Sequence, residues 1–263
     1  MLSASSVLAE GKKLATKLSA NTAFVLAISE CNKLSSQYEE MLGSVKKEAG
    51  PETATGLRKA DGIYQRLQMA NWKLAQSIFR ITGAAHGYPI KLKIEHPEAS
   101  TIRQWCSEFE HMICRAPVPD KLVIKHVTAN GHSKSFPRAY YDSFQNIVYL
   151  PDSTSRSVVW HAISHYLEYK TPGLQEVAEV YLASRTANAE AKRLGPGYML
   201  AEKAKEADFI HPYCGKIYQD GGTEILAMGI QFMTEDPSKL WLEDREMFEF
   251  TLGCINAARG ASQ

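Results

Sequence analysis

One segment, VVWHAISHYLEYKTP at residues 158–172, restricts the possible fold of this chain more than any other. Its apolar residues recur with the period of an α-helix, and a Thr-Pro-Gly sequence ends the pattern. His161 and His165 are four residues apart, so on a helix they lie on the same face, one turn apart. Two imidazoles placed in this way can bind one metal ion.

The spacing alone is a weak indication of a metal site. The chain has eight histidines, and a pair four residues apart often arises by chance, so the bare pair favours two ordinary polar residues on a helix. The surroundings favour the metal. The segment follows an expected strand at 146–150 and three candidate N-cap residues, Asp152, Ser153 and Thr154.

The pattern of the whole chain predicts an α+β fold, mainly helical, with a small antiparallel sheet beside the histidine helix. Strands are expected within 84–97, over 121–127 and as a pair within 138–151. A break is expected at 50–56. The expected helical ranges, besides the histidine helix, are 3–48 (one or two helices), 57–82, 98–115, 174–193, 198–208, from about 223, and 238–258. We divide the chain into an N-terminal helical region, 1–83, and a second domain, 84–263.

Composition narrows the class of protein. The 263 residues are 44% apolar and 22% charged, which is ordinary for a globular chain with a buried core. A formal net charge of +1 argues against general nucleic-acid binding, which needs a concentrated basic surface. The sequence has no long apolar run, so we expect no membrane span and no secretory signal. Five scattered cysteines favour free thiols in a reduced, intracellular setting.

Glu224 is the residue that best completes a metal site. A helix is expected to open at Gly221-Gly222-Thr223 and to carry Glu224 near its start, ahead of apolar residues. A carboxylate on an apolar helix face is costly to bury unless it is paired or bound to a metal. The alternative is a surface glutamate in the first helical turn, where the helix dipole favours negative charge. We prefer the ligand interpretation.

Motifs in the second half of the chain resemble one family. RSVVWHAISHYLEYKTP and the later HPYCGKIYQDGGTEILAMGIQFMTEDP together resemble phage- and prophage-associated zinc metallopeptidases of gluzincin type. The pattern of that family is H-E-x-x-H-x-x-E, G-K-x-Y, T-E-[IV]-x-S-M-G and an acidic D-P loop. The matching residues are His161, His165, Glu168, Gly215, Lys216, Tyr218, Thr223, Glu224, Met228, Gly229, Asp236 and Pro237. The resemblance covers about residues 120–252 and leaves the N-terminal helices outside.

The resemblance implies a zincin-like fold in which His161, His165 and Glu224 bind Zn²⁺. The chain departs from the family mildly at Ala227 and decisively at Ala162, where the family has the glutamate that takes a proton from the zinc-bound water. Such a general base contributes about 10²–10⁴ in rate, and alanine cannot replace it. Two accounts are open. In the first, the glutamate of an active peptidase was replaced by alanine. In the second, the chain is a natural pseudoenzyme. The intact set of candidate metal ligands favours the first.

Other polar residues near these motifs have weaker assignments. Tyr218, and less so Tyr213, are candidate hydrogen-bond donors to the oxyanion of a tetrahedral intermediate, or else core tyrosines. Glu168, on the face of His165, either orients an imidazole or is a solvated helix carboxylate. Asp220 is a poorer candidate of the same kind, and we take His211 as a surface residue.

The function that this pattern favours is a zinc-dependent metallopeptidase, inactivated here at Ala162, that hydrolyses peptide bonds of a protein substrate with metal-activated water. We expect Zn²⁺ as cofactor and no nucleic-acid or membrane partner. The resemblance implies a bacterial cytoplasm or a phage particle as the location. Region 1–83 is expected to recognise the substrate or to regulate the peptidase.

A protein of a different class stays open. The same zinc site can stabilise a non-catalytic structural or interaction protein, such as a virion component or a pseudopeptidase. That hypothesis predicts four protein ligands and no open cleft, whereas a catalytic zinc site takes three ligands from the protein and a water. A third possibility, a metal-free helical module, predicts no stoichiometric metal.

Overall fold

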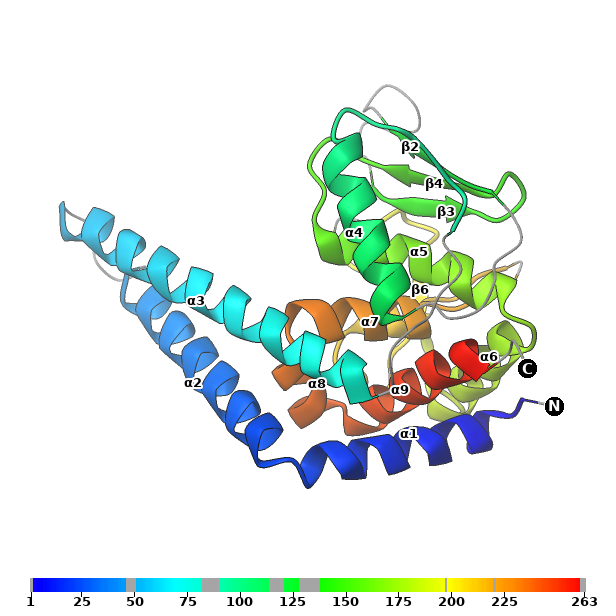
Figure 1. Ribbon diagram of the computed structural model, residues 1–263, viewed down its shortest axis with the longest axis horizontal. Helices are drawn as coiled ribbons and strands as arrows, with labels where there is room; N and C mark the ends of the chain where they lie inside the picture. The colour runs from blue at the N-terminus through cyan, green and yellow to red at the C-terminus, as the bar shows by residue number, and fades with distance from the viewer. Residues whose placement is uncertain are drawn as a thin grey trace.

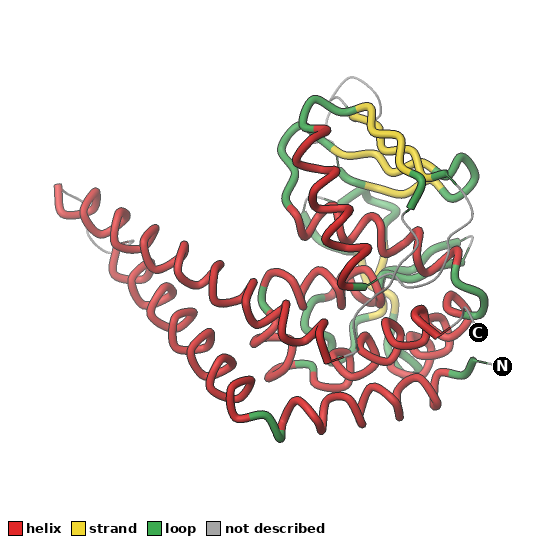
Figure 2. The backbone as a smooth tube through the Cα atoms, in the orientation of Figure 1, coloured by secondary structure: helices red, strands yellow, loops and turns green. Residues whose placement is uncertain are grey.

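The computed structural model describes residues 2–45, 51–81, 90–113, 121–127, 138–196, 198–219 and 221–260. Within these ranges the protein is mainly helical with short strands, which confirms the predicted α+β class (Figures 1 and 2). In chain order the elements are α1 (Ala4–Ser19), α2 (Thr22–Val45), α3 (Pro51–Ile81), β1 (Leu92–Glu95), α4 (Ala99–Met112), β2 (Leu122–His126), β3 (Tyr140–Asp142), β4 (Ile147–Leu150), α5 (Arg156–Lys170), α6 (Leu174–Arg185), β5 (Ala191–Arg193), β6 (Lys203–Lys205), a 3-10 turn η1 (Pro212–Gly215), α7 (Ile225–Glu235), α8 (Pro237–Glu243) and α9 (Arg245–Gly260).

The N-terminal helices divide into two arrangements. Helices α2 and α3 pair with each other, and the end at which α2 finishes and α3 begins extends away from the rest of the molecule, whereas the C-terminal part of α3 packs on the core (Figure 1). Helix α1 instead lies along α9, the last helix of the chain. A side chain at Gly11 would overlap the backbone of Glu249, and one at Gly253 would overlap the backbone of Val7. The two helices therefore approach closely because both positions are glycine.

The predicted break at 50–56 is wrong in its extent, because α3 begins at Pro51. Proline is favoured at the first position of a helix, where its missing N–H has no intrahelical partner. Pro51, which was interpreted as a helix stop, therefore begins α3. Gly56 continues it, at a position where a side chain would overlap Val45 of α2.

The main sheet has the strand order β1-β2-β4-β3. The pairs β1–β2 and β2–β4 are parallel, and only β3–β4 is antiparallel, so the prediction of an antiparallel sheet is wrong. The connection from β1 to β2 contains α4, and a crossover that contains a helix returns the chain in the parallel direction. Helix α5 contacts β3 and β4, as expected of a sheet beside the histidine helix.

Helix α5 is capped and anchored at its N-terminal end. Ser155 is the N-cap residue and accepts a hydrogen bond from the Val158 N–H, which corrects the three candidates at 152–154. Trp160 is fully buried, packs edge-on against Trp72 of α3 and Phe109 of α4, and donates its indole N–H to the Trp105 carbonyl at 2.9 Å. This apolar anchor holds α5 between the sheet and the long helices.

Two helical predictions in the second half are corrected. The range 174–193 contains α6 only to Arg185. Strand β5, at the end of that range, pairs antiparallel with β6, which lies where a helix over 198–208 was expected. The expected helix at 238–258 is two helices, α8 and α9, with Asp244 between them. The Asp244 carboxylate accepts the N–H of Met247 at 3.1 Å and so caps α9.

The buried residues form one continuous core to which both predicted regions contribute. Leu14 of α1, Leu74 of α3, Trp160 of α5 and Phe250 of α9 all belong to it. Residue 83, the predicted end of the first region, lies outside the described residues, and the division at 83/84 stays a prediction. Among the described helices, none is both long enough and apolar enough to cross a membrane.

Candidate metal centre

Three potential metal ligands come from two neighbouring helices. His161 and His165 lie one turn apart on α5, with ring centroids 5.0 Å apart. Glu224 is the N-cap residue of α7, which packs against α5. Just before it, Gly221 and Gly222 have φ of 84° and 91°, a region that favours glycine. These two glycines make the turn that brings Glu224 to the histidines.

The three ligand atoms form a triangle of nearly equal sides. Nε2 of His161 and Nε2 of His165 each lie 3.2 Å from Oε2 of Glu224, and 3.3 Å from each other. A tetrahedral zinc ion with bonds of about 2.0–2.1 Å separates its ligand atoms by about 3.3 Å. The triangle therefore has the size that one such ion requires, and the three residues form a group that can hold a metal ion.

The environment of Glu224 also fits a cation. Its side chain is 1% exposed, and within the described part of the chain Oε2 has no hydrogen-bond partner. A buried carboxylate oxygen without a partner is costly, and a metal ion at the centre of the triangle would satisfy it. The donor set of two imidazoles and one carboxylate is one that zinc accepts.

The electrostatics keep this carboxylate ionised. Burial raises the pKa of Glu224, but the charge of His165 and the contacts with both imidazoles outweigh burial, so the pKa lies well below its usual value. For His165 the two effects have the opposite signs. Burial lowers its pKa, but the neighbouring Glu224 carboxylate raises it by more, so the pKa of His165 is raised. The ionised carboxylate is the form that binds a metal.

Tyr218 contacts the second oxygen of the same carboxylate. Its hydroxyl donates a short hydrogen bond to Oε1 of Glu224. Burial, together with the negative charge of Glu224, raises the pKa of Tyr218, so the hydroxyl keeps its proton. In this arrangement the hydroxyl orients a ligand, and the predicted role as an oxyanion donor stays a prediction.

Glu168 lies on α5, three residues after His165, the position for which a role in orienting an imidazole was predicted. It is buried and accepts hydrogen bonds from the N–H of Thr223 at 3.3 Å and from the hydroxyl of Thr223 at 3.0 Å. Its partner is thus the residue before Glu224, and among the described residues no hydrogen bond joins it to an imidazole. Burial is the largest influence on this carboxyl and raises the pKa of Glu168 to about 8.

A charged network beside the triangle was missed in the sequence. Nζ of Lys216 lies 3.0 Å from Oε1 of Glu202 and 3.9 Å from Oε1 of Glu224. Nη1 of Arg138 lies 3.0 Å from Oε2 of Glu202. These residues come from three separate segments, so no spacing in the sequence joins them. Lys216 alone carried a signal, as part of the Gly-Lys-x-Tyr motif.

Tyr213 completes this network. Its hydroxyl accepts hydrogen bonds from Nη2 of Arg138 at 2.9 Å and Nζ of Lys216 at 3.2 Å. Its ring stacks on Tyr198 with centroids 5.4 Å apart, and lies 6.5 Å from the ring of His161. The wall next to His161 is therefore aromatic and carries two cations.

The remaining predicted positions lie as follows. Ala162 is fully buried on α5, between the two histidines in sequence. His211 is the N-cap residue of η1, where its ring accepts the N–H of Tyr213 at 3.1 Å. Asp220 lies outside the described residues.

Comparison of the chain with protein-family models, curated proteins and solved structures found no match. The resemblance to phage-associated zinc peptidases therefore stays a prediction, and the site is interpreted from its own geometry.

Proposed function

We propose that this protein is a zinc-dependent metallopeptidase of gluzincin type in which the metal site is complete and the position of the general base is occupied by Ala162. The observation that supports the proposal is the triangle of His161, His165 and Glu224, whose edges of 3.2–3.3 Å match those of a tetrahedral zinc site. The proposed substrate is a peptide bond of another protein.

In this proposal His161, His165 and Glu224 hold Zn²⁺, which when bound acts as a Lewis acid on water and on the substrate carbonyl. Tyr218 orients the Glu224 carboxylate through its hydrogen bond to Oε1. The aromatic wall of Tyr213 and Tyr198 lies next to His161, where it can exclude water on one side. The methyl group of Ala162 can neither accept nor return a proton, so the chain as it stands lacks general-base catalysis.

The number of ligands favours an enzyme-type site over a purely structural zinc site. A closed structural site uses four protein ligands, and the cluster found within the described ranges has three. The fourth position is then available to water or substrate. One observation favours the non-catalytic hypothesis instead: Ala162 is fully buried, and a position packed for alanine would suit a protein without a general base.

The test is Ala162→Glu, with Ala162→Gln as the matched control. The two side chains have nearly the same shape, and only glutamate is a base. After zinc loading, we expect Ala162→Glu to cleave members of a peptide library at least about 100-fold faster than the other two forms. New peptide termini are detected by mass spectrometry, and a chelator should abolish the cleavage.

Metal content is measured on the same samples by elemental mass spectrometry. About one zinc per chain, lost in His161→Ala, is expected. A folded Ala162→Glu chain that binds zinc and cleaves nothing would favour the structural zinc protein. Equal loss of folding in the Glu and Gln variants would show that position 162 belongs to the core, and a chain that takes up no zinc would contradict both hypotheses.

A further inference from the structure

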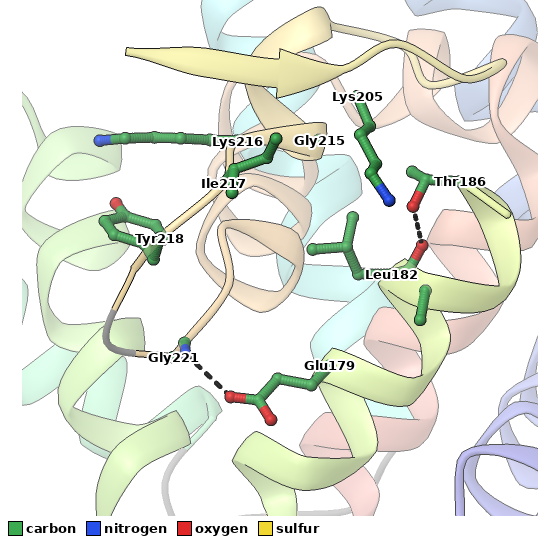
Figure 3. Close-up of a pocket in the computed structure, with 11 residues that line it drawn as sticks. Glu179, Leu182, Thr186, Lys205, Gly215, Lys216, Ile217, Tyr218 and Gly221 are labelled. Carbon is green, nitrogen blue, oxygen red and sulfur yellow. Dashed lines mark hydrogen bonds between the residues drawn. The ribbon is translucent and has the colours of Figure 1, made fainter. Parts of the chain in front are cut away.

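A pocket of about 260 Å³ lies between α6 and the segment that leads into Glu224 (Figure 3). Leu182 and Ala183 of α6 form one wall, and Gly215, Ile217 and Gly222 belong to the opposite wall. The volume is slightly below the 300–1,000 Å³ that is usual for ligand pockets, so the pocket suits a ligand smaller than a typical drug.

This pocket is separate from the metal triangle, although one segment borders both. In an extended segment, side chains alternate between two sides. Lys216 and Tyr218 point away from α6, toward Glu224, whereas Ile217 between them is 41% exposed beside the pocket (Figure 3). The segment is thus a partition, with the metal ligands on one side and the pocket on the other.

Opposite charges lie at opposite sides of the pocket. Lys205 enters from β6 and Glu179 from α6 (Figure 3). Lys205 makes no ion pair or side-chain hydrogen bond with the part of the chain that the structure describes. Its amine therefore stays available to an external anion.

Glu179 is held in place by one oxygen only. Oε1 accepts the N–H of Gly222 and the amide of Gln175, both at 2.9 Å. Among the described residues, no donor reaches Oε2. The carboxylate is therefore oriented by its neighbours while its second oxygen stays available to an external cation.

We propose that this pocket binds a short zwitterionic peptide, of about dipeptide size, with the carboxylate of the peptide on Lys205 and its ammonium group on Glu179. The aliphatic side chains of Leu182 and Ile217 would contact the middle of the ligand. An α-amino acid carries both charged groups on one carbon, whereas a dipeptide carries them at its two ends, and Lys205 and Glu179 enter the pocket from different elements (Figure 3). The proposal does not depend on the proposed peptidase activity.

The test is isothermal titration calorimetry of the full chain, with alanyl-leucine, glycyl-valine and alanyl-alanine as probes. Binding is measured for the zinc-loaded chain and for the metal-free chain, since a dipeptide on the metal would be lost with the metal. N-acetyl-alanyl-leucine lacks the ammonium group and alanyl-leucinamide lacks the carboxylate. We expect each blocked peptide to bind at least about tenfold more weakly than alanyl-leucine, the size expected for one charged hydrogen bond.

Matched variants locate the site. Lys205→Met and Glu179→Gln should each weaken binding of alanyl-leucine at least about tenfold, and Ala183→Trp should abolish it by filling the pocket. Lys203→Met and Glu176→Gln change exposed charges on the same two elements, outside the pocket, and should leave binding unchanged.

Three results would overturn the proposal. The first is no binding of any probe at about 10 mM, a concentration that detects even millimolar affinity. The second is equal binding of the blocked and unblocked peptides. The third is binding that disappears with the metal, or in His165→Ala, while Ala183→Trp retains it. Ala183 is exposed, so its replacement is expected to leave folding intact, which a circular dichroism melt verifies.

Discussion

At the scale of single residues, the two oxygens of Glu224 have different tasks. Oε2 faces both imidazoles, and Oε1 accepts the hydroxyl of Tyr218, so the hydroxyl fixes the rotation of the carboxylate. Residues that orient a metal ligand usually contribute a factor of about 10–100 to metal affinity.

Tyr218→Phe removes this hydrogen bond and keeps the ring. We expect zinc affinity to fall about 10- to 100-fold, because the free carboxylate can then rotate away from the histidines. Competition with a chromogenic chelator gives the affinity. Tyr169→Phe, which changes an exposed tyrosine on α5, is the control and should bind zinc as the unaltered chain does. Unchanged affinity in Tyr218→Phe would show that packing alone orients the ligand.

The metal-free protein should also respond to pH through Glu168. Burial raises the pKa of this carboxyl from 4.5 to about 8 in the folded state, so folding favours its protonated form. That contribution to stability is complete below about pH 4.5 and is lost as the pH rises toward 8. Glu168→Gln carries no titrating group, so it should become more stable relative to the unaltered chain by about 2–4 kcal/mol between acidic and mildly basic pH.

Urea unfolding of the chelator-treated chain at both ends of this pH range gives the difference. Glu176→Gln, at an exposed position, should show no such change. A difference of the opposite sign would mean that the hydrogen bonds from Thr223 stabilise the ionised form more than burial opposes it.

At the scale of elements, α1 and α9 approach each other closely at Gly11 and Gly253. Gly11→Ala and Gly253→Ala each place a methyl group against the backbone of the other helix, which cannot move aside as a side chain would. We expect each change to lower the free energy of unfolding by about 1–3 kcal/mol, although alanine is the better helix former. Gly43→Ala, within α2 at a position where no atom of the described residues lies within 4 Å of the added methyl group, should raise it by about 0.5–1 kcal/mol. Denaturant unfolding measures all three.

Elements with a strong local pattern could be predicted from the sequence. Strand β2 has the alternation that its burial requires, and helix α5 has a run of apolar residues that ends before Pro172, so both elements were expected, and with α5 the pair His161–His165. The pair β5–β6 could not be predicted in the same way. Its segments, rich in alanine, lysine and glutamate, have helical propensity, and tertiary contacts override it, since Ala204 is buried and bridges to Lys216.

The candidate site also contains residues that could be predicted from the sequence and residues that could not. The candidate ligands His161, His165 and Glu224 stand in recognisable motifs, and the structure brings them together. Arg138 and Glu202 meet beside this cluster only because β3, the β5–β6 pair and the segment after η1 converge in space. A network built from such distant positions leaves no periodic signal in a single sequence.

At the scale of the whole molecule, one core connects helices from both ends of the chain. Leu18 of α1 and Ile255 of α9 belong to the same apolar cluster as Ile163 of α5. A shared core of this kind predicts that region 1–83 and region 84–263 unfold together. In differential scanning calorimetry the calorimetric and van't Hoff enthalpies should therefore agree. Two resolved transitions would instead support two independently stable domains.

The contact between α1 and α9 also bears on how the protein is made. Helix α1 is the first described element to leave the ribosome and α9 is the last, so the surface that α1 must cover does not exist until almost all of the described chain has been synthesised. Contacts between such distant segments form slowly, because a long loop must close first. During translation the apolar face of α1 therefore stays uncovered until α9 has been synthesised. Helix α5 with the histidines and helix α7, which Glu224 caps, emerge within that interval, so the nascent chain presents the candidate metal ligands before the core beneath them has closed.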